Sequence, residues 1–349
     1  MPMESTMELT RTTLAYQTEA EWLKARTVDL TSTETAALFD SSPYFTEFEL
    51  HNIKIGRLEK AFEENDRTKW GNRLESAIAA GIAEDMGLIV QPFKTYMRIP
   101  ELRMGSSFDF KVVGVAPGMP SNFAREMFDK HGPGIMEIKN VDGLQFRRAW
   151  IADGGEAIEA PPHIELQVQH QLEVADMPWT LIAPLVGGNT PRPMVRERDA
   201  EVGELIRKRV QRFWDRIAAG VSPEPHYLDD ADTISKLYLE NDGSALDLTS
   251  NPRVYELCKE YKMHGEAAKA AEDRKKAARA ELLTIIGAAK SVKAAGFSIS
   301  AGTNKESFRT YDREAGERVT ITISKIPASH VEATVPPFRN VRITETKAA

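Results

Sequence analysis

The chain of 349 residues carries 45 Lys and Arg against 52 Asp and Glu, a formal net charge of −7, and its length predicts about two domains. Its 42 % hydrophobic and 28 % charged residues exclude global disorder. The single cysteine, Cys258, excludes an intrachain disulfide framework, a zinc ribbon and a four-cysteine iron–sulfur cluster, and the lack of a ~20-residue apolar run or a secretory signal predicts a cytoplasmic protein without membrane contact.

The N-terminal region is predicted to contain a polar tail and two short helices. We expect residues 1–20 to form a poorly ordered tail. A short helix is predicted from Glu21 to Arg26. A second short helix carries Ala36, Ala37 and Leu38, and its N-cap is Thr31, Ser32 or Thr33.

The clearest helix is predicted between Thr68 and Met86. Trp70, Leu74, Ile78 and Ile82 recur every four residues and therefore share one face. Gly87 ends this helix, and an extended segment, LIVQPFKTYMRI, follows.

Two strands with period-2 alternation are predicted next, at Gly105–Val115 and Gly134–Val141. In the first strand Phe108, Phe110 and Val112 share one side. The remaining elements expected before residue 220 are a short helix at 122–130, a helix at 163–175, a buried strand at 179–187 and an amphipathic helix at 201–219.

The proline-bearing loop Val221–Asp230 is the predicted domain boundary. We therefore expect a first domain at 21–225 and a C-terminal extension at 226–349. The extension is predicted to hold a long charged helix or helical hairpin at 256–286, followed by strands within 297–323.

The two strands at 105–115 and 134–141 present the residues most suited to chemistry. Asp109 lies on the first strand, and Glu137 and Lys139 share one side of the second. If these strands pair, two carboxylates and an ammonium meet. Crowded carboxylates repel, and a divalent cation removes that conflict. The alternative interpretation is a surface salt bridge on a solvated strand face.

Four motifs in order resemble the YqaJ-like viral recombinase branch of the PD-(D/E)XK nucleases, the group that contains the lambda-type phage exonucleases. WGNRLESAIAAGIAEDMG resembles the first helix of that family, SSFDF its aspartate strand, GIMEIKNV its glutamate–x–lysine strand, and HIELQVQHQLEV its glutamine helix. The resemblance covers about Trp22–Pro225. It implies an α/β (α+β) fold, with a restriction-endonuclease-like core in which helices flank a central mixed sheet, and a C-terminal helical and β extension.

The resemblance also implies a catalytic set. Asp109, Glu137 and the Ile138 carbonyl would bind Mg²⁺, for which Mn²⁺ would substitute, and Glu75 would serve a second ion. Lys139 would orient the attacking water. The family's glutamine is Gln167 or Gln169, and we expect Gln167 to hold Lys139 or the scissile phosphate. By contrast, we expect His170 to be a core residue rather than a metal ligand.

A pocket for a 5′ phosphate is implied by the same resemblance. Its residues would be Arg26, Thr33 and Ser107, with Ser32 as an alternative to Thr33. Arg147 and Arg148 are equal candidates for the arginine that follows the second strand, and Gln169 is a further candidate for DNA contact. A surface arginine at 26 and a plain helix cap at 33 are the alternative interpretations.

The implied activity is Mg²⁺-dependent 5′-to-3′ exonuclease action on double-stranded DNA, which leaves 3′ overhangs in a phage-type single-strand annealing system. The implied partners are DNA ends, an annealing protein and further copies of this chain in a ring, for which a trimer is one option. The implied setting is the cytoplasm of a bacterial host that carries a phage or prophage. The alternatives are a non-processive endonuclease or helicase-associated nuclease, and a catalytically silent DNA-binding or annealing module. Because Glu137 is expected to act as a ligand rather than in packing, Glu137→Ala is predicted to remove activity and leave the fold intact.

Overall fold

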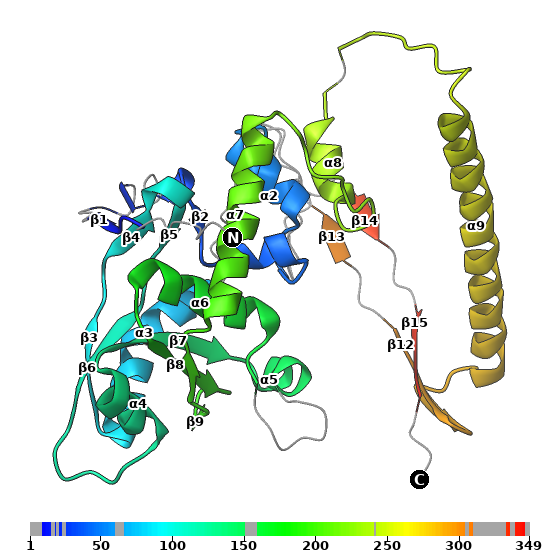
Figure 1. Ribbon diagram of the computed structural model, residues 1–349. Coiled ribbons are helices and arrows are strands. Elements are labelled where there is room, and N and C mark those ends of the chain that lie inside the picture. Colours follow the sequence, from blue (N-terminus) through cyan, green and yellow to red (C-terminus); the bar gives the residue numbers. More distant parts are fainter. Residues whose placement is uncertain are drawn as a thin grey trace. The chain divides into compact units, whose positions relative to one another are not determined.

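The computed structural model describes residues 9–14, 18, 21–22, 26–59, 66–150, 159–240, 242–303, 307–309, 333–335 and 339–345 (Figure 1). The chain divides into two compact units, Met1–Asp242 and Gly243–Ala349. Three predictions lie outside these residues in whole or in part: the tail at 1–8, the middle of the helix at 21–26, and most of the strand region beyond 303.

A mixed β-sheet forms the centre of the first unit (Figure 1). Its strands lie in the order β10-β8-β7-β6-β3, with β9 paired to β8. β7 and β8 are parallel, whereas the other neighbours are antiparallel. The strands of this sheet are β3 (Leu88–Pro92), β6 (Phe110–Val115), β7 (Gly134–Val141), β8 (Trp179–Val186), β9 (Thr190–Pro191) and β10 (Met194–Glu197).

Helices cover both faces of this sheet, as predicted. Met136 and Ile138 of β7 pack in a core with α3 (Asp66–Met86) and α4 (Phe123–His131). Ile135 points the other way, into a core that includes α6 (Pro162–Ala175) and α7 (Ala200–Ala218). Alternate side chains of β7 therefore pack in two different apolar cores, one on each face of the sheet. The predicted fold class, a central mixed sheet flanked by helices, is confirmed.

The prediction of one strand across 105–115 is wrong. β5 (Met104–Ser106) ends before Asp109 and belongs to a second sheet of order β1-β4-β5-β2, whereas β6 belongs to the central sheet. Phe108 packs in the core with α6 and Phe110 in the core with α3, so they do not share a face. The alternation restarts where the chain passes from one sheet to the other. The other strands of the second sheet are β1 (Thr12–Leu14), β2 (Leu30–Thr31) and β4 (Tyr96–Ile99).

Three local expectations also differ from the structure. β1 lies within the predicted tail and pairs with β4. The short helix after Thr33 is a 3-10 helix, η1 (Thr35–Phe39), and no side chain caps it. Instead, Glu34 Oε2 accepts a hydrogen bond from the Thr31 N–H at 2.9 Å. Trp70 is 52 % exposed, because only the part of α3 from Leu74 onward packs on the core.

The segment predicted as a boundary, 221–230, belongs to the first unit. Asp230 is buried and accepts hydrogen bonds from the Thr46 hydroxyl (2.5 Å) and the His226 N–H (2.7 Å). Thr46 is the N-cap of α2 (Glu47–Lys54), so these contacts fasten the loop to the domain. The division of the chain therefore falls after Asp242 rather than at 225. The remaining elements of this unit are η2 (Pro100–Leu102), α5 (Gly143–Ala149) and α8 (Ala231–Leu237).

The second unit contains the long helix that the charged composition predicts, α9 (Pro252–Ile286). Ile286 at its end packs with Ile299 and Ala301. The strands are β11 (Ser291–Ala294), β12 (Phe297–Thr303), β13 (Ser307–Arg309), β14 (Ala333–Val335) and β15 (Arg339–Glu345). Among the described helices of both units, none combines the length and apolarity that crossing a membrane requires.

Candidate active site

Asp109, Glu137 and Lys139 meet at one end of the β6–β7 pair. Phe110 pairs with Met136, and continuing this antiparallel register places Asp109 opposite Glu137. The Ile138 N–H donates a hydrogen bond to Asp109 Oδ2 at 2.8 Å. Lys139 Nζ donates to Glu137 Oε1 at 2.5 Å. The three groups that the sequence indicated are therefore brought together.

Two amides of α6 complete the surroundings of Glu137, which is 3 % exposed. Gln167 Nε2 donates to Glu137 Oε1 at 2.6 Å, and Gln171 Nε2 donates to Glu137 Oε2 at 2.8 Å. Gln171 was not predicted as a site residue. Its spacing of four from Gln167, which puts both amides on one helix face, is the signal that could have identified it.

Negative charge is concentrated in this cluster. Burial, followed by the charge of Glu137, raises the pKa of Asp109 well above its usual range. Burial and Glu137 also raise the pKa of Glu75 on α3. Burial alone would lower the pKa of Lys139, but the carboxylates of Glu137 and Asp109 outweigh it, so that its pKa is raised. Lys139 only partly offsets the repulsion between the carboxylates.

The donor set fits a hard divalent cation. In the described part of the chain no three Asp, Glu, His or Cys side chains are close enough to hold a metal together. Asp109 and Glu137 nevertheless offer carboxylate oxygens beside the Ile138 backbone. Mg²⁺-type ions commonly bind one or two carboxylates and keep several waters. A cation would also relieve the repulsion that raises the pKa of Asp109. Glu75 lies within electrostatic range but completes no three-carboxylate group.

The structure brings together two residues of the predicted phosphate pocket. Trp22 Nε1 donates to Ser107 Oγ at 2.7 Å, and the Arg26 guanidinium lies 4.3 Å from the Trp22 ring centroid. Thr33 is exposed, and its hydroxyl lies 3.3 Å from the Thr31 hydroxyl. By contrast, Ser32 is buried and accepts from Ser106 Oγ. Of the two alternatives, only the Thr33 hydroxyl is open to a ligand.

The other predicted DNA contacts lie differently. Arg147 and Arg148 are both exposed in the last turn of α5, so the structure does not choose between them. Gln169 is buried and bonded to backbone groups at the start of α7, where it donates to the Glu197 carbonyl and accepts from the Asp199 N–H, both at 2.9 Å. Gln169 therefore does not join the cluster, because it faces a different side of α6 from Gln167.

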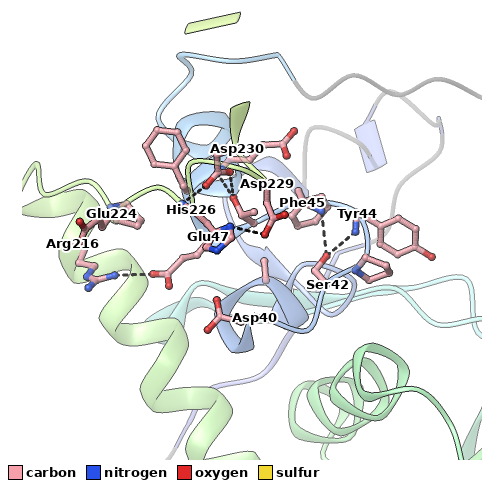
Figure 2. Close-up of a pocket in the computed structure, with 16 residues that line it drawn as sticks. Asp40, Ser42, Tyr44, Phe45, Glu47, Arg216, Glu224, His226, Asp229 and Asp230 are labelled. Atoms are coloured by element: carbon pink, nitrogen blue, oxygen red, sulfur yellow. Dashed lines mark hydrogen bonds and ion pairs between the residues drawn. The ribbon is translucent and has the colours of Figure 1, made fainter. Parts of the chain in front are cut away.

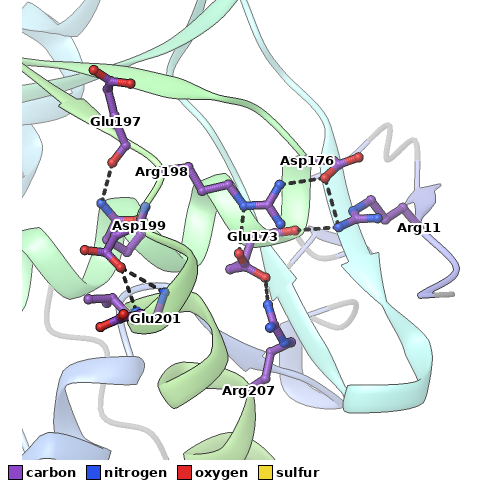
Figure 3. Close-up of polar contacts among 10 residues, drawn as sticks. Arg11, Glu173, Asp176, Glu197, Arg198, Asp199, Glu201 and Arg207 are labelled. Atoms are coloured by element: carbon purple, nitrogen blue, oxygen red, sulfur yellow. Dashed lines mark hydrogen bonds and ion pairs between the residues drawn. The ribbon is translucent and has the colours of Figure 1, made fainter. Parts of the chain in front are cut away.

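An ion-pair cluster holds α6 against β10 and α7 (Figure 3). Glu173, which is 1 % exposed, accepts from Arg198 at 2.7 Å and from Arg207. Arg198 also pairs with Asp176 at 2.7 Å. A buried carboxylate with two guanidinium partners fixes the position of α6. This is the support that Gln167 and Gln171 need to hold Glu137 in one place.

A cavity of about 790 Å³ lies apart from this cluster (Figure 2). It lies beside α2 and the end of α7, and neither Asp109, Glu137 nor Lys139 lines it. The carboxylates in its lining are those of Asp40, Glu47, Glu49, Glu224, Asp229 and Asp230. Such a lining repels phosphate, so DNA is not expected to enter it.

His170 is a buried core residue, as expected. Its ring nitrogens lie 2.6 Å from Thr35 Oγ1 and 3.2 Å from the Gly105 carbonyl. Burial lowers the pKa of His170 to about 4. The ring is therefore neutral at pH 7 and links η1, α6 and β5.

Neutral His170 makes the stability of the domain fall in mild acid. Because the His170 ring binds a proton near pH 6.5 in the unfolded chain and only near pH 4 in the folded chain, the contribution of His170 to the unfolding free energy decreases as pH falls through this window. The expected loss is on the order of 3 kcal/mol. Denaturant unfolding of the wild type and of His170→Asn between pH 7 and pH 4 measures it, with exposed His226→Asn as the control. Equal pH dependence in all three proteins would contradict this assignment.

A known family model matches the part of the chain that contains the cluster. Residues 21–178 match the YqaJ-like viral recombinase domain, a range that includes Asp109, Glu137, Lys139 and Gln167. Two crystal structures of LHK-Exo, an alkaline exonuclease from Laribacter hongkongensis, are similar at TM-scores of 0.43 (with dAMP) and 0.42. Their identities are 17 % and 18 %, over 62 % of this chain and 98 % of theirs. A phage-related exonuclease from Haemophilus somnus 129PT has a TM-score of 0.34 and 14 % identity, over 59 % of this chain and 90 % of its own. No curated protein matches the chain.

Proposed function

We propose that the chain is a Mg²⁺-dependent exonuclease that degrades double-stranded DNA from the 5′ end and leaves 3′ overhangs. The match of residues 21–178 to the YqaJ-like viral recombinase domain supports this proposal. The observation that carries the proposal is the meeting of Asp109, Glu137 and Lys139 where β6 and β7 pair. Metal-assisted phosphodiester hydrolysis needs carboxylates to hold a cation and an adjacent cationic group for the developing charge.

The chain's residues divide the work as follows. Asp109, Glu137 and the Ile138 carbonyl would hold Mg²⁺, with Glu75 near a second ion. A bound Mg²⁺ supplies Lewis-acid stabilisation of the phosphate. The Lys139 ammonium, already 2.5 Å from Glu137, is placed to orient the attacking water and to donate to a phosphate oxygen. Gln167 and Gln171 keep the Glu137 carboxylate in one orientation.

The 5′ polarity is proposed from the donors of the predicted phosphate pocket, of which the structure brings Arg26 and Ser107 together through Trp22. The Arg26 guanidinium, the Ser107 hydroxyl and the exposed Thr33 hydroxyl are donors that suit a terminal phosphate, with Arg147 or Arg148 as a further cation. The proposed partners are DNA ends, a single-strand annealing protein and further copies of this chain in a ring. The proposed setting is the cytoplasm of a bacterial host.

The buried carboxylates argue against a catalytically silent DNA-binding module. A surface that only binds DNA gains nothing from Asp109 and Glu137 near phosphates, because crowded carboxylates repel each other and the ligand. An endonuclease with the same catalytic groups is the other candidate. It differs from an exonuclease because it requires no DNA end.

One assay separates these functions. Linear duplex DNA with and without a 5′ phosphate, and covalently closed circles, are incubated with Mg²⁺, Mn²⁺ or EDTA. We expect digestion of linear DNA only, faster from the phosphorylated end, supported by either metal and abolished by EDTA. Nicking of closed circles would indicate an endonuclease, and no cleavage with either metal would overturn the nuclease proposal.

A further inference from the structure

A pair of aromatic side chains lies beside the catalytic cluster. The rings of Tyr44 and His163 are 6.0 Å apart, edge to face at 89°. His163 is in the first turn of α6, four residues before Gln167, so it shares the helix face from which Gln167 reaches Glu137.

The Tyr44 side chain is exposed although hydrogen bonds hold its backbone in place. Ser42 Oγ accepts hydrogen bonds from the N–H groups of Tyr44 (3.2 Å) and Phe45 (3.3 Å). The Phe45 side chain packs against the core, and Thr46 begins α2. Tyr44 itself is 72 % exposed and stands at the border of the acidic cavity, which it helps to line. Its ring points away from Asp229 and Asp230 of that cavity (Figure 2).

A backbone held in place and an exposed ring are the properties of an aromatic side chain on which a nucleobase can stack. The His163 ring meets the Tyr44 ring at a right angle, and Tyr44 still remains 72 % exposed, so this contact supports the ring and leaves most of it open. Nucleobases stack on such rings whatever their sequence, because every base has a π face. An exonuclease that degrades any sequence needs this kind of contact near the reacting phosphate.

We propose that Tyr44, held by His163, stacks on the nucleobase next to the scissile phosphate and so positions the terminal nucleotide over Lys139. The proposal rests on the proposed exonuclease function. Tyr44 acts as a positioning residue, since it places the nucleotide and takes no part in bond breaking. The ring, and not the hydroxyl, carries this role.

The kinetic test uses short 5′-phosphorylated duplexes whose terminal nucleotide is either normal or abasic. We expect Tyr44→Ala to raise the KM for normal DNA by about 5- to 150-fold and to change kcat less. Tyr44→Phe retains the wild-type KM. Removal of the base raises the KM of the wild type similarly but adds little in Tyr44→Ala, because both changes remove one contact. Tyr238→Ala, at another exposed tyrosine (70 %), is the control. Additive losses, or a Tyr44→Phe defect as large as that of Tyr44→Ala, would overturn the proposal.

A second measurement keeps this proposal separate from the exonuclease proposal. A 2-aminopurine base at the 5′ end of a duplex reports stacking by its fluorescence, and EDTA prevents cleavage. We expect quenching by the wild type and by Tyr44→Phe, and its loss in Tyr44→Ala. If the wild type degrades linear DNA but quenching is equal in all variants, only the stacking proposal fails. If the wild type degrades no DNA, the proposed exonuclease function fails. The quenching then still shows whether Tyr44 stacks on the terminal base.

Discussion

Asp109→Asn is expected to lower the rate of DNA cleavage by about 10³-fold or more and, at the same time, to stabilise the metal-free protein. The loss of activity follows because a carboxylate ligand contributes several kcal/mol to transition-state stabilisation, and each ~1.4 kcal/mol is tenfold in rate. The gain in stability follows because the ionised Asp109 carboxylate is destabilising at its buried position beside Glu137. Burial, then Glu137, raise its pKa, and an amide carries no charge to be repelled.

The raised pKa of Asp109 also predicts the direction in which the unfolding free energy changes with pH. Folded Asp109 retains a proton that the unfolded chain releases near pH 3.8, so the contribution of Asp109 to the unfolding free energy falls as pH rises from there through the raised pKa. Asp109→Asn lacks this fall. Denaturant and thermal unfolding with EDTA, from pH 4 to pH 8, measure the difference. A Tm for the variant at or below that of the wild type at pH 8 would contradict the account.

A matched control is Asp247→Asn in the second unit. Asp247 is exposed, and hydrogen bonds from the hydroxyl and N–H of Thr249 lower its pKa. The same change of group there relieves no repulsion. We therefore expect Asp247→Asn to leave the cleavage rate unchanged and to bring no gain in Tm. Addition of Mg²⁺ should raise the Tm of wild type and control, and raise that of Asp109→Asn less.

The elements were predicted best where the apolar residues of one helix or strand follow a single period along its whole length. β7 has the predicted bounds, because Met136 and Ile138 face one core while Glu137 and Lys139 face the other side. α3, α6 and α7 also lie where apolar periodicity indicated them. Since Glu137 and Lys139, the proposed catalytic pair, lie on such a strand, their convergence could be predicted from spacing alone.

The predictions failed where the outcome depends on which distant segment becomes the neighbour. Nothing local in residues 105–115 reveals that β5 pairs with β4 while β6 pairs with β3 and β7. This change of sheet places Asp109 at the end of β6 rather than within a continuous strand. Gln169 and Gln171 are likewise alike in sequence, and only the position of α7 decides that Gln169 bonds to backbone while Gln171 reaches Glu137.

The burial of Glu137 changes the expectation for Glu137→Ala, which the sequence alone predicted to leave the fold intact. Glu137 accepts hydrogen bonds from Lys139, Gln167 and Gln171 while almost completely buried. Its removal leaves two amide donors without this acceptor and an ammonium without its nearest carboxylate. We expect the unfolding free energy to fall by about 2–5 kcal/mol, together with a loss of cleavage of about 10³-fold or more.

Glu137→Ala and Asp109→Asn therefore share the loss of activity but differ in the sign of their effect on stability. Asp109 is a charge that the metal-free fold tolerates, whereas Glu137 is a charge around which β7 and α6 are bonded together. Glu137→Gln separates the two roles of Glu137, because its carbonyl oxygen still accepts from one amide. We expect it to be as inactive as Glu137→Ala but less destabilised. Circular dichroism at 20 °C, denaturant unfolding and cleavage of linear duplex DNA measure these properties, and a Glu137→Ala protein that unfolds like the wild type would contradict the structural role of Glu137.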